Sequence, residues 1–299
     1  AYGGGYTVTC DYTQGIRFQY SPDGQNFVES PIDDTQGGWR DLAYGNGRFV
    51  SCSPNNNDIS GNAATYQFTM SLTGTGEVGE RTELTFVDTT NLSSISGGTA
   101  VVQNSGGTPV TSEITDLTTL TGGWTSLGAG GLGTSSSWTS IGFGGGSWVA
   151  VADTGGPQVA WSGDGAGWVQ NSSANAFGSA WSSVAYGDPG GTGTWVAVAG
   201  GGSNRAMYST DGGVSWTDVP GQPDMAWQSV TYGDGRWVAV ANDGNKRAMY
   251  STNGADWTPV TLPVTSTTNW SGVTYGAGKF VAVSYGGGAA DELSLIHIS

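Results

Sequence analysis

A repeat of about 44 residues constrains the fold of this chain more than any other feature of its sequence. Each copy begins with Trp, alternates through a Gly-rich turn and continues into a run of Val and Ala. The four clearest copies are WTSIGFGGGSWVAVA from Trp138, WSSVAYGDPGGTGTWVAVA from Trp181, WQSVTYGDGRWVAVA from Trp227 and WSGVTYGAGKFVAVS from Trp270. A fifth copy, WRDLAYGNGRFVSCS, begins at Trp39, and the opening AYGGGYTVTC is a sixth copy without its leading Trp.

A second, shorter motif follows most copies and adds two more strands to each repeat. It reads YSPDGQNF from Tyr20, WSGDGAGW from Trp161, YSTDGGVSW from Tyr208 and YSTNGADW from Tyr250. Its Asp-Gly and Asn-Gly turns supply the positive φ that tight hairpins require. Four short strands in about 44 residues are typical of a propeller blade. The sequence therefore predicts an all-β fold, a β-propeller of four-stranded blades, with six represented and the first and last incomplete.

The blade that begins at Trp39 is interrupted by an insertion. Trp39 and Trp138 lie 99 residues apart, about twice the repeat period. If Trp124 closes this blade, about 55 residues have been added, and they contain alternating stretches rich in Thr and Val. We therefore expect propeller blades in residues 1–56, an inserted small β module in 57–116 and further blades in 117–292.

The last seven residues, 293–299, read LSLIHIS and resemble the in-frame translation of a transposase sequencing adapter. We expect this segment to be an artefact and not part of the protein. His297, within it, is the only His of the chain. Without His297, Ser-His-Asp triads and His-ligated metal sites are excluded.

The charge balance limits the classes of partner. The chain has 24 acidic and nine basic residues, a formal net charge of −15. Proteins that bind nucleic acids neutralise phosphates with Lys and Arg, so a nucleic-acid partner is excluded. No apolar run approaches the length of about 18 residues that a transmembrane helix needs, so we expect no membrane insertion.

Two small-residue positions of the repeat also carry information. Cys10 and Cys52 fall where other copies have Val, so we expect small buried groups and no disulfide. Ala197 and Ala239 are expected on inner strands, close to the central channel. The cysteine spacing suits no metal, and we predict neither a metal site nor a cofactor.

The second motif resembles the Asp box, or BNR repeat, of sialidase-like β-propellers, written Ser-x-Asp-x-Gly-x-x-Trp. The full spacing is matched by Ser209, Asp211, Gly213 and Trp216. Versions one residue shorter contain Ser21 and Asp23, Ser162 and Asp164, and Ser251, Asn253 and Trp257. We expect a structural role for all of them, in which Ser and Asp bind backbone N–H groups, Gly is left-handed and Trp packs between sheets.

The same resemblance raises the hypothesis of an enzyme. Sialidase-like enzymes use an arginine cluster, a Tyr–Glu pair and an Asp acid, with an Arg-Ile-Pro signature that this chain lacks. Arg17, Arg205 and Arg247 share one repeat position, four residues before the Ser of the motif. We expect them to be the candidates for binding an acidic ligand. We predict no catalytic residue and no enzymatic activity, and catalytic groups on blades outside this sequence are the alternative.

The inserted stretch TELTFVDTTNL resembles segments of virion proteins from marine tailed phages, especially cyanophages. This resemblance implies a structural or recognition protein, such as a tail-fibre component that binds a host-surface glycan. Its partners would be that glycan or other virion proteins, and its location the virion or the extracellular space. The alternatives are a fragment of a sialidase-like glycoside hydrolase, a photosystem-assembly-type Asp-box propeller, or a secreted bacterial surface protein.

Overall fold

The structure is a computed structural model, and among the residues that it describes the regular elements are β-strands and a 3-10 turn, η2 (Pro189–Gly191). It describes residues 1–3, 6–10, 18–21, 24–29, 40–46, 48–53, 62–67, 71–72, 84–85, 94–95, 98–103, 109–114, 117–118, 125–126, 136–165, 167–171, 178–243, 248–260, 269–285 and 294–296. Within these ranges, no helix has the length and apolarity needed to cross a bilayer.

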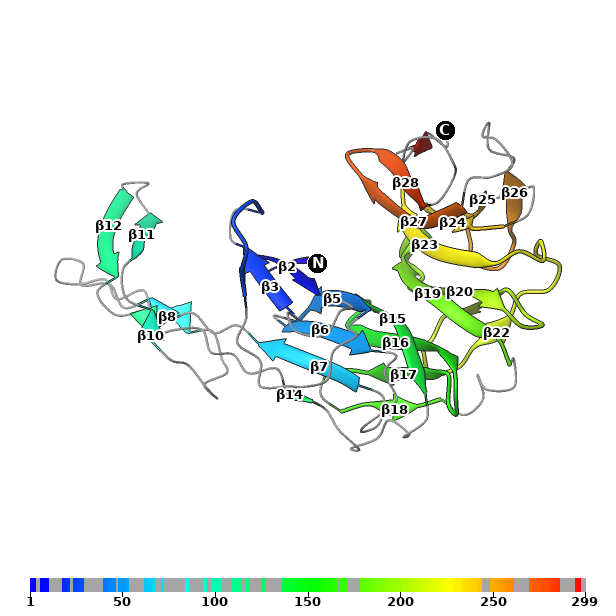
Figure 1. Cartoon of the computed structure of the whole chain (residues 1–299), viewed down its shortest axis with the longest axis horizontal. Helices are drawn as coiled ribbons and strands as arrows, with labels where there is room; N and C mark the ends of the chain where they lie inside the picture. The colour runs from blue at the N-terminus through cyan, green and yellow to red at the C-terminus, as the bar shows by residue number, and fades with distance from the viewer. Residues whose placement is uncertain are drawn as a thin grey trace.

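Six antiparallel sheets repeat one plan, in which strands that follow each other along a repeat lie side by side. The first sheet contains β1 (Tyr2–Gly3), β2 (Tyr6–Cys10), β3 (Phe18–Ser21) and β4 (Val28–Glu29). The second contains β5 (Asp41–Gly45), β6 (Arg48–Ser53), β7 (Asn62–Gln67) and β14 (Thr125–Ser126). The third contains β15 (Ser137–Gly144), β16 (Ser147–Thr154), β17 (Val159–Ser162) and β18 (Val169–Gln170). The fourth sheet contains β19 (Ala180–Gly187), β20 (Thr194–Gly201), β21 (Ala206–Ser209) and β22 (Thr217–Asp218). The fifth contains β23 (Trp227–Gly233), β24 (Arg236–Ala241), β25 (Ala248–Ser251) and β26 (Thr258–Val260). The sixth contains β27 (Asn269–Gly276), β28 (Lys279–Tyr285) and β29 (Ser294–Ile296). Figure 1 shows these sheets following one another along an open arc. The predicted all-β propeller of four-stranded blades is confirmed.

The first strand of each blade is the innermost, and the second strand is the most buried. The first strands β15, β19, β23 and β27 lie against one another in chain order. In β20 the run from Trp195 to Ala199 has no exposed surface, because neighbouring blades cover both faces of the sheet. Ala197 and Ala239 lie on the second strands β20 and β24, directly beside the innermost strands, and both are fully buried. They are small because a sheet packs on each side of them.

The expected insertion, residues 57–116, includes a strand that pairs within the blade of Trp39. β7 pairs along the whole of β6 and serves as the third strand of that blade. The fourth strand, β14, begins directly after Trp124, as β22 begins directly after Trp216. Trp124 itself lies outside the described residues. The structure therefore places the inserted strands between β7 and β14.

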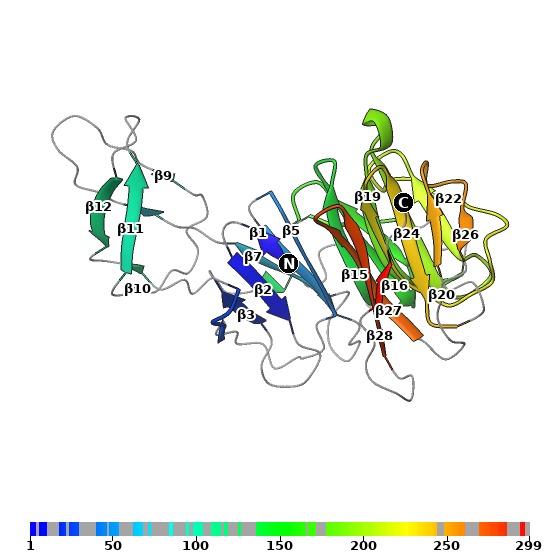
Figure 2. The same cartoon turned by 90° about the horizontal axis from the view of Figure 1, so that it is seen from above.

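The inserted region contains short antiparallel pairs that lie apart from the blades in both views (Figures 1 and 2). Its strands are β8 (Ser71–Leu72), β9 (Leu84–Thr85), β10 (Ser94–Ile95), β11 (Gly98–Gln103), β12 (Pro109–Ile114) and β13 (Leu117–Thr118). They pair as β8 with β9, β10 with β13 and β11 with β12. At the other end of the chain, β29 lies within residues 293–299 and pairs with β28. That pairing does not bear on the origin of the seven residues.

Successive blades interlock through an aromatic ring that lies over a glycine. First strands end in Tyr-Gly or Phe-Gly, and the aromatic residue of the next blade fills the space beside this glycine. A Cβ on Gly144 would lie 2.2 Å from Cγ of Tyr186, and one on Gly233 would lie 2.1 Å from Cγ of Tyr275. Tyr186 also packs on Trp195 of its own blade, with ring centroids 5.3 Å apart. The glycine of each dipeptide is therefore required by packing between blades.

A second interlock joins the inner edges of neighbouring blades. A serine hydroxyl on one first strand accepts a hydrogen bond from a backbone N–H on the next first strand. The pairs are Ser140 Oγ with Val184 N at 3.3 Å, Ser183 Oγ with Val230 N at 3.1 Å and Ser229 Oγ with Val273 N at 3.1 Å. Inner strands are edge strands, so these bonds satisfy N–H groups that no further strand reaches.

Asp41 takes the place of this serine on β5. Its Oδ2 accepts hydrogen bonds from Ile141 N at 2.9 Å and Ser140 Oγ at 2.7 Å. Its Oδ1 accepts one from Leu42 N at 2.8 Å. Desolvation by burial raises the pKa of Asp41 above its usual 3.8, although these hydrogen bonds oppose the shift. The carboxyl group thus interlocks two blades and carries a charge that folding disfavours.

We predict that Gly144→Ala destabilises the fold by about 1–3 kcal/mol, because its new Cβ overlaps the ring of Tyr186. Gly163→Ala is the matched control, since a Cβ there meets no described atom within 4 Å. Chemical denaturation of both variants measures the free energy of unfolding. Equal effects at the two positions would contradict the packing argument.

We predict a pH-dependent difference between the wild type and Asp41→Asn. The folded pKa of Asp41 is raised, so above about pH 3.8 the folded state binds more protons than the unfolded state and stability falls with rising pH. Asn cannot ionise and lacks this loss. The free energy of unfolding of the wild type minus that of the variant should therefore decrease from about pH 3 to pH 7. A constant or rising difference in denaturation experiments would show that this carboxyl is not desolvated.

Candidate functional site

The antiparallel strand order gives the blades two opposite faces. The turn face carries the links between first and second strands and between third and fourth strands. Its described segments include 145–146, 188–193, 234–235, 163–165, 210–216 and 252–257. The loop face carries the links between second and third strands and the connections between blades. Its described segments include 155–158, 202–205, 242–243, 178–179 and 219–226.

On the turn face, the residues that match the full Asp-box spacing form one hydrogen-bonded turn. Ser209 Oγ accepts from Gly213 N at 3.0 Å and donates to Asp211 Oδ1 at 2.8 Å. Asp211 Oδ1 also accepts from Ser215 N at 2.8 Å, and Trp216 Nε1 donates to Gly213 O at 2.9 Å. Desolvation raises the pKa of Asp211, but hydrogen bonds from Ser215 and Ser209 outweigh it and hold the pKa below 3.8.

The shorter versions of the motif have similar geometry. The serine hydroxyl accepts a backbone N–H in each: Gly165 N to Ser162 Oγ at 2.8 Å and Gly254 N to Ser251 Oγ at 2.9 Å. The side chain two residues later also accepts: Gly167 N to Asp164 Oδ1 and Asp256 N to Asn253 Oδ1, both at 2.8 Å. Trp257 Nε1 donates to Gly254 O at 3.0 Å. Ser21 is buried, and Asp23 lies outside the described residues.

The glycine of each turn packs against the preceding blade. Gly213 has φ of 92°, and a Cβ there would lie 2.5 Å from Cγ2 of Val149. Gly254 has φ of 78°, and a Cβ there would lie 3.0 Å from Cγ2 of Val196. A left-handed backbone and a close neighbour both favour glycine. These turns therefore close their own blade and position it on the one before.

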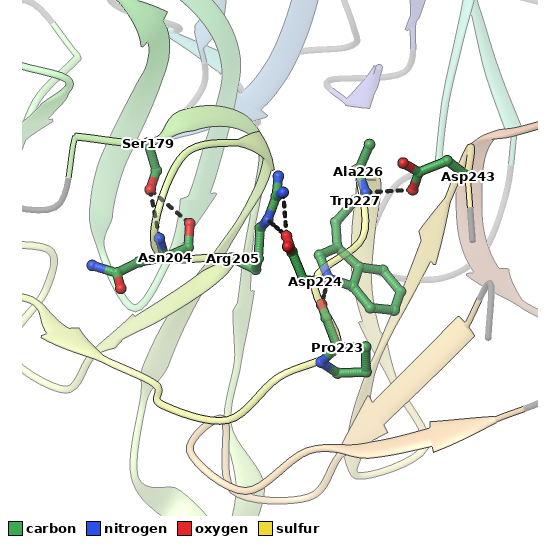
Figure 3. Close-up of polar contacts among 8 residues, drawn as sticks. All are labelled: Ser179, Asn204, Arg205, Pro223, Asp224, Ala226, Trp227 and Asp243. Atoms are coloured by element: carbon green, nitrogen blue, oxygen red, sulfur yellow. Dashed lines mark hydrogen bonds and ion pairs between the residues drawn. The ribbon is translucent and has the colours of Figure 1, made fainter. Parts of the chain in front are cut away.

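On the loop face, Arg205 is the described member of the predicted arginine set. Its Nε donates to Asp224 Oδ1 at 2.8 Å, and its Nη2 forms an ion pair with the same oxygen (Figure 3). The side chain of Arg205 is 17% exposed and that of Asp224 is 85% exposed. Arg17 and Arg247 lie outside the described residues. The charge of Arg205 is thus compensated by a carboxylate from the connection to the next blade.

Two further links fix the loops beside this ion pair (Figure 3). Ser179 Oγ donates to Asn204 O at 2.6 Å and accepts from Asn204 N at 3.1 Å. Asp243 Oδ1 accepts from Ala226 N at 2.6 Å. Each link joins the segment that enters a blade to the loop after its second strand. The loop face is therefore an ordered polar surface around Arg205.

A depression of about 520 Å³ opens on the loop face beside Ser179. Its lining residues are Asp153, Thr154, Gly155, Gly156, Gln158, Gly178, Ser179, Ala180 and Gly202. Gln158 Nε2 donates to Ser179 O at 2.6 Å, which ties the two sides together. Thr154 Oγ1 donates to Asp153 Oδ1 at 3.2 Å. Four of the nine lining residues are glycines, whose backbone groups no side chain covers.

The repeat did not point to this depression. The loops read DTGGPQ, GGSNR and NDGNKR in successive blades, and apart from the Arg that ends the last two they share no motif. Their Gly content and their place between second and third strands were the available signals. Variable loops on a rigid scaffold are common places for binding sites.

Two tyrosines and one cysteine of the blades have raised pKa values, which favour their uncharged forms. Burial and the charge of Asp188 raise the pKa of the hydroxyls of Tyr186 and Tyr232 above 10. A nucleophilic Tyr needs the opposite shift or an adjacent base. Burial raises the pKa of the Cys52 thiol well above its usual range, so this thiol behaves as the expected small buried group. In the described part of the chain, no three His, Cys, Asp or Glu side chains gather to hold a metal ion.

The repeated sheets and their interlocks define a β-propeller protein, and structural comparisons agree. No protein-family model matches the chain, and no curated protein sequence does. A GH74 enzyme from Niastella koreensis is similar, with 13% identity, a TM-score of 0.54 and coverage of 94% of this chain and 39% of that one. The GH74 xyloglucanase from Xanthomonas campestris has 14% identity, a TM-score of 0.54 and coverage of 94% and 40%. A chain of a nidogen–laminin complex has 10% identity, a TM-score of 0.50 and coverage of 94% and 86%.

These neighbours are β-propeller proteins, and at such identities they show the fold alone. The chain spans about two fifths of the length of the two GH74 enzymes. The neighbours also include both hydrolases and a protein of a binding complex, so the fold does not decide between catalysis and binding.

We predict that Arg205 and Asp224 are coupled by less than about 1 kcal/mol, since one partner is exposed. A double-mutant cycle with Arg205→Met and Asp224→Asn measures this energy, which should shrink in about 1 M salt. Arg236→Met and Asp234→Asn form the control cycle, because that pair is 3.9 Å apart and should show weaker coupling. Coupling that is insensitive to salt would contradict an exposed ion pair.

Proposed function

We propose that this chain is a non-catalytic recognition protein whose loop face binds a neutral, hydroxyl-rich ligand. The observation that carries this proposal is the depression beside Ser179, lined by backbone groups, hydroxyls, an amide and the carboxylate of Asp153. Such groups donate and accept hydrogen bonds in several directions, as sugar hydroxyls require. The ligand that fits this chemistry is a glycan of a host surface.

The charge of the molecule supports a neutral glycan over an acidic one. The chain has a formal net charge of −15, which repels anions at long range. Arg205 on the same face is already paired with Asp224. An acidic sugar would have to displace that carboxylate. We therefore favour hydrogen-bonded recognition of hydroxyl groups over recognition of a sialic-acid-type carboxylate.

The lining of the depression favours binding over glycoside hydrolysis. Glycosidases in general use two carboxyl groups that flank the scissile bond. Among the described residues that line the depression, Asp153 is the one carboxylate. This composition suits a site that orients a ligand without cleaving it.

The resemblance of the inserted stretch to phage virion proteins extends the proposal. A tail-fibre component would present the loop face to a host glycan from the virion, outside the cell. The interlocked blades would hold that face rigid, which lowers the entropy lost on binding. Other virion proteins would be its second class of partner.

Binding to immobilised bacterial surface polysaccharides, neutral and acidic, tests the proposal by biolayer interferometry. We predict binding to a neutral polysaccharide that Asp153→Ala weakens about tenfold or more, roughly the loss of one charge-assisted hydrogen bond. Asp256→Ala is the matched control on the turn face, since Asp256 also accepts a single side-chain hydrogen bond, from Asn253. This control should bind as the wild type does.

Binding confined to acidic polysaccharides, or equal effects of the two variants, would contradict the proposed site. Release of new reducing ends from a bound polysaccharide would instead support the hydrolase alternative. Both readouts use the same protein preparations.

A further inference from the structure

On the loop face, neighbouring blades meet at a junction, where the loop after a second strand lies beside the connection to the next blade. The loops after β16 and β20 have the same length and end at the same repeat position, which Gln158 and Arg205 occupy. The backbone also agrees, since Gln158 O accepts from Ala152 N at 2.9 Å and Arg205 O accepts from Ala199 N at 3.0 Å. The two junctions therefore share a backbone plan and differ in their side chains.

At the junction after β20, the residue at this position forms an ion pair with the connection to β23. Arg205 Nε donates to Asp224 Oδ1 at 2.8 Å (Figure 3). The side chain of Arg205 is 17% exposed, so most of it lies within the junction. An arginine at this repeat position thus spans the junction and takes a carboxylate as its partner.

At the junction after β16, a neutral amide takes the place of the arginine. Gln158 Nε2 donates to Ser179 O on the connection at 2.6 Å, and it also donates to Asp153 O at 3.3 Å. The Gln158 residue is buried. The connection offers no acidic partner to a cation here, because residues 172–180 contain neither Asp nor Glu. Gln158 therefore joins the loop to the connection without a charge.

The walls of the depression are also held by contacts that do not involve residue 158. Ser136 Oγ donates to Pro157 O at 2.8 Å and fixes the loop after β16. Ser179 Oγ donates to Asn204 O at 2.6 Å. A Cβ at Gly202 would lie 2.5 Å from Cα of Ser179, so these two segments are in close contact. A substitution at residue 158 should therefore change the charge and the filling of the depression more than the position of its walls.

We propose that Gln158 is the residue that determines the class of ligand accepted by the depression beside Ser179. This inference rests on the proposed function, because the depression is the site proposed there. Gln158 keeps this junction neutral and leaves the carboxylate of Asp153 available to ligand hydroxyls. Asp153 is the one carboxylate among the described lining residues. Arginine is longer than glutamine and always charged, so at this position it would pair with Asp153 and close the site.

Binding to the neutral polysaccharide, measured by biolayer interferometry, tests the role of Gln158. Gln158→Arg should weaken binding about tenfold or more, because the new guanidinium occupies the carboxylate of Asp153. Gln158→Met removes the amide but adds no charge, so it should weaken binding only about threefold, the loss expected for one neutral hydrogen bond. Thr217→Arg is the control, since it adds the same charge at an exposed position of the outer strand β22 and should bind as the wild type does.

A second measurement detects the new ion pair without any ligand. Asp153→Asn is introduced into the wild type and into Gln158→Arg, and the melting temperatures of all four proteins are compared. Asp153→Asn should lower the melting temperature more in the Gln158→Arg background. About 1 M salt should remove this excess, because it screens an ion pair near the surface.

The outcomes separate this inference from the proposed function. Equal binding of the neutral polysaccharide by the wild type and Gln158→Arg would overturn the inference and leave the proposed function intact. A wild type that binds no polysaccharide would overturn both. Equal effects of Asp153→Asn in the two backgrounds would overturn the closing ion pair, whatever the polysaccharides do. Binding of an acidic polysaccharide by Gln158→Arg would also overturn it, because the new charge would then recruit a ligand and not close the site.

Discussion

The unpaired inner edge of each blade is the constraint on which the rest of this structure depends. A first strand has a neighbour on one side, so its outward N–H groups would remain without partners. The preceding blade supplies acceptors: Ser183 Oγ lies 3.1 Å from Val230 N, and Ser229 Oγ lies 3.1 Å from Val273 N. A β-bulge directly before each serine changes the direction of its side chain. Each blade therefore completes the hydrogen bonding of the next one.

The unusual glycine content follows from how closely the blades approach. The chain has 53 glycines, which on composition alone would suggest a flexible polymer. In the structure, Gly187 leaves room for Tyr232, and Gly213 leaves room for Val149. A large residue from one blade needs the absence of a side chain on its neighbour. Aromatic residues and glycines are thus two halves of one packing arrangement, which explains why a glycine-rich chain also has 13 Trp and 12 Tyr.

The repeat allowed most of the fold to be predicted, because equivalent residues make equivalent contacts in successive blades. The closing position of Trp124 was predicted from spacing, and β14 begins directly after it. The pairing of NAATYQ with β6 could not be predicted, because this stretch carries no part of the second motif. The small size of Ala197 predicted close packing, but not which neighbours are close. The candidate site could not be predicted, because it lies in loops that do not repeat. The ion pair of Arg205 could not be predicted either, because its partner, Asp224, has no counterpart in the other repeats.

The two faces of the molecule differ in the same way: the turn face is built from residues of the repeat, and the loop face from residues that do not repeat. On the turn face, Ser209, Asp211 and Gly213 use their polar groups and their backbone conformation to close a blade and position it. A substitution in these turns therefore affects the packing of the blades more directly than it affects an exposed surface. On the loop face, the segments that follow β16 and β20 differ in sequence, although the strands they join are nearly identical in pattern. Because these loops are free from the packing constraints of the repeat, they can form a depression around Gln158 and Ser179, and for this reason the proposed recognition site is placed on that face.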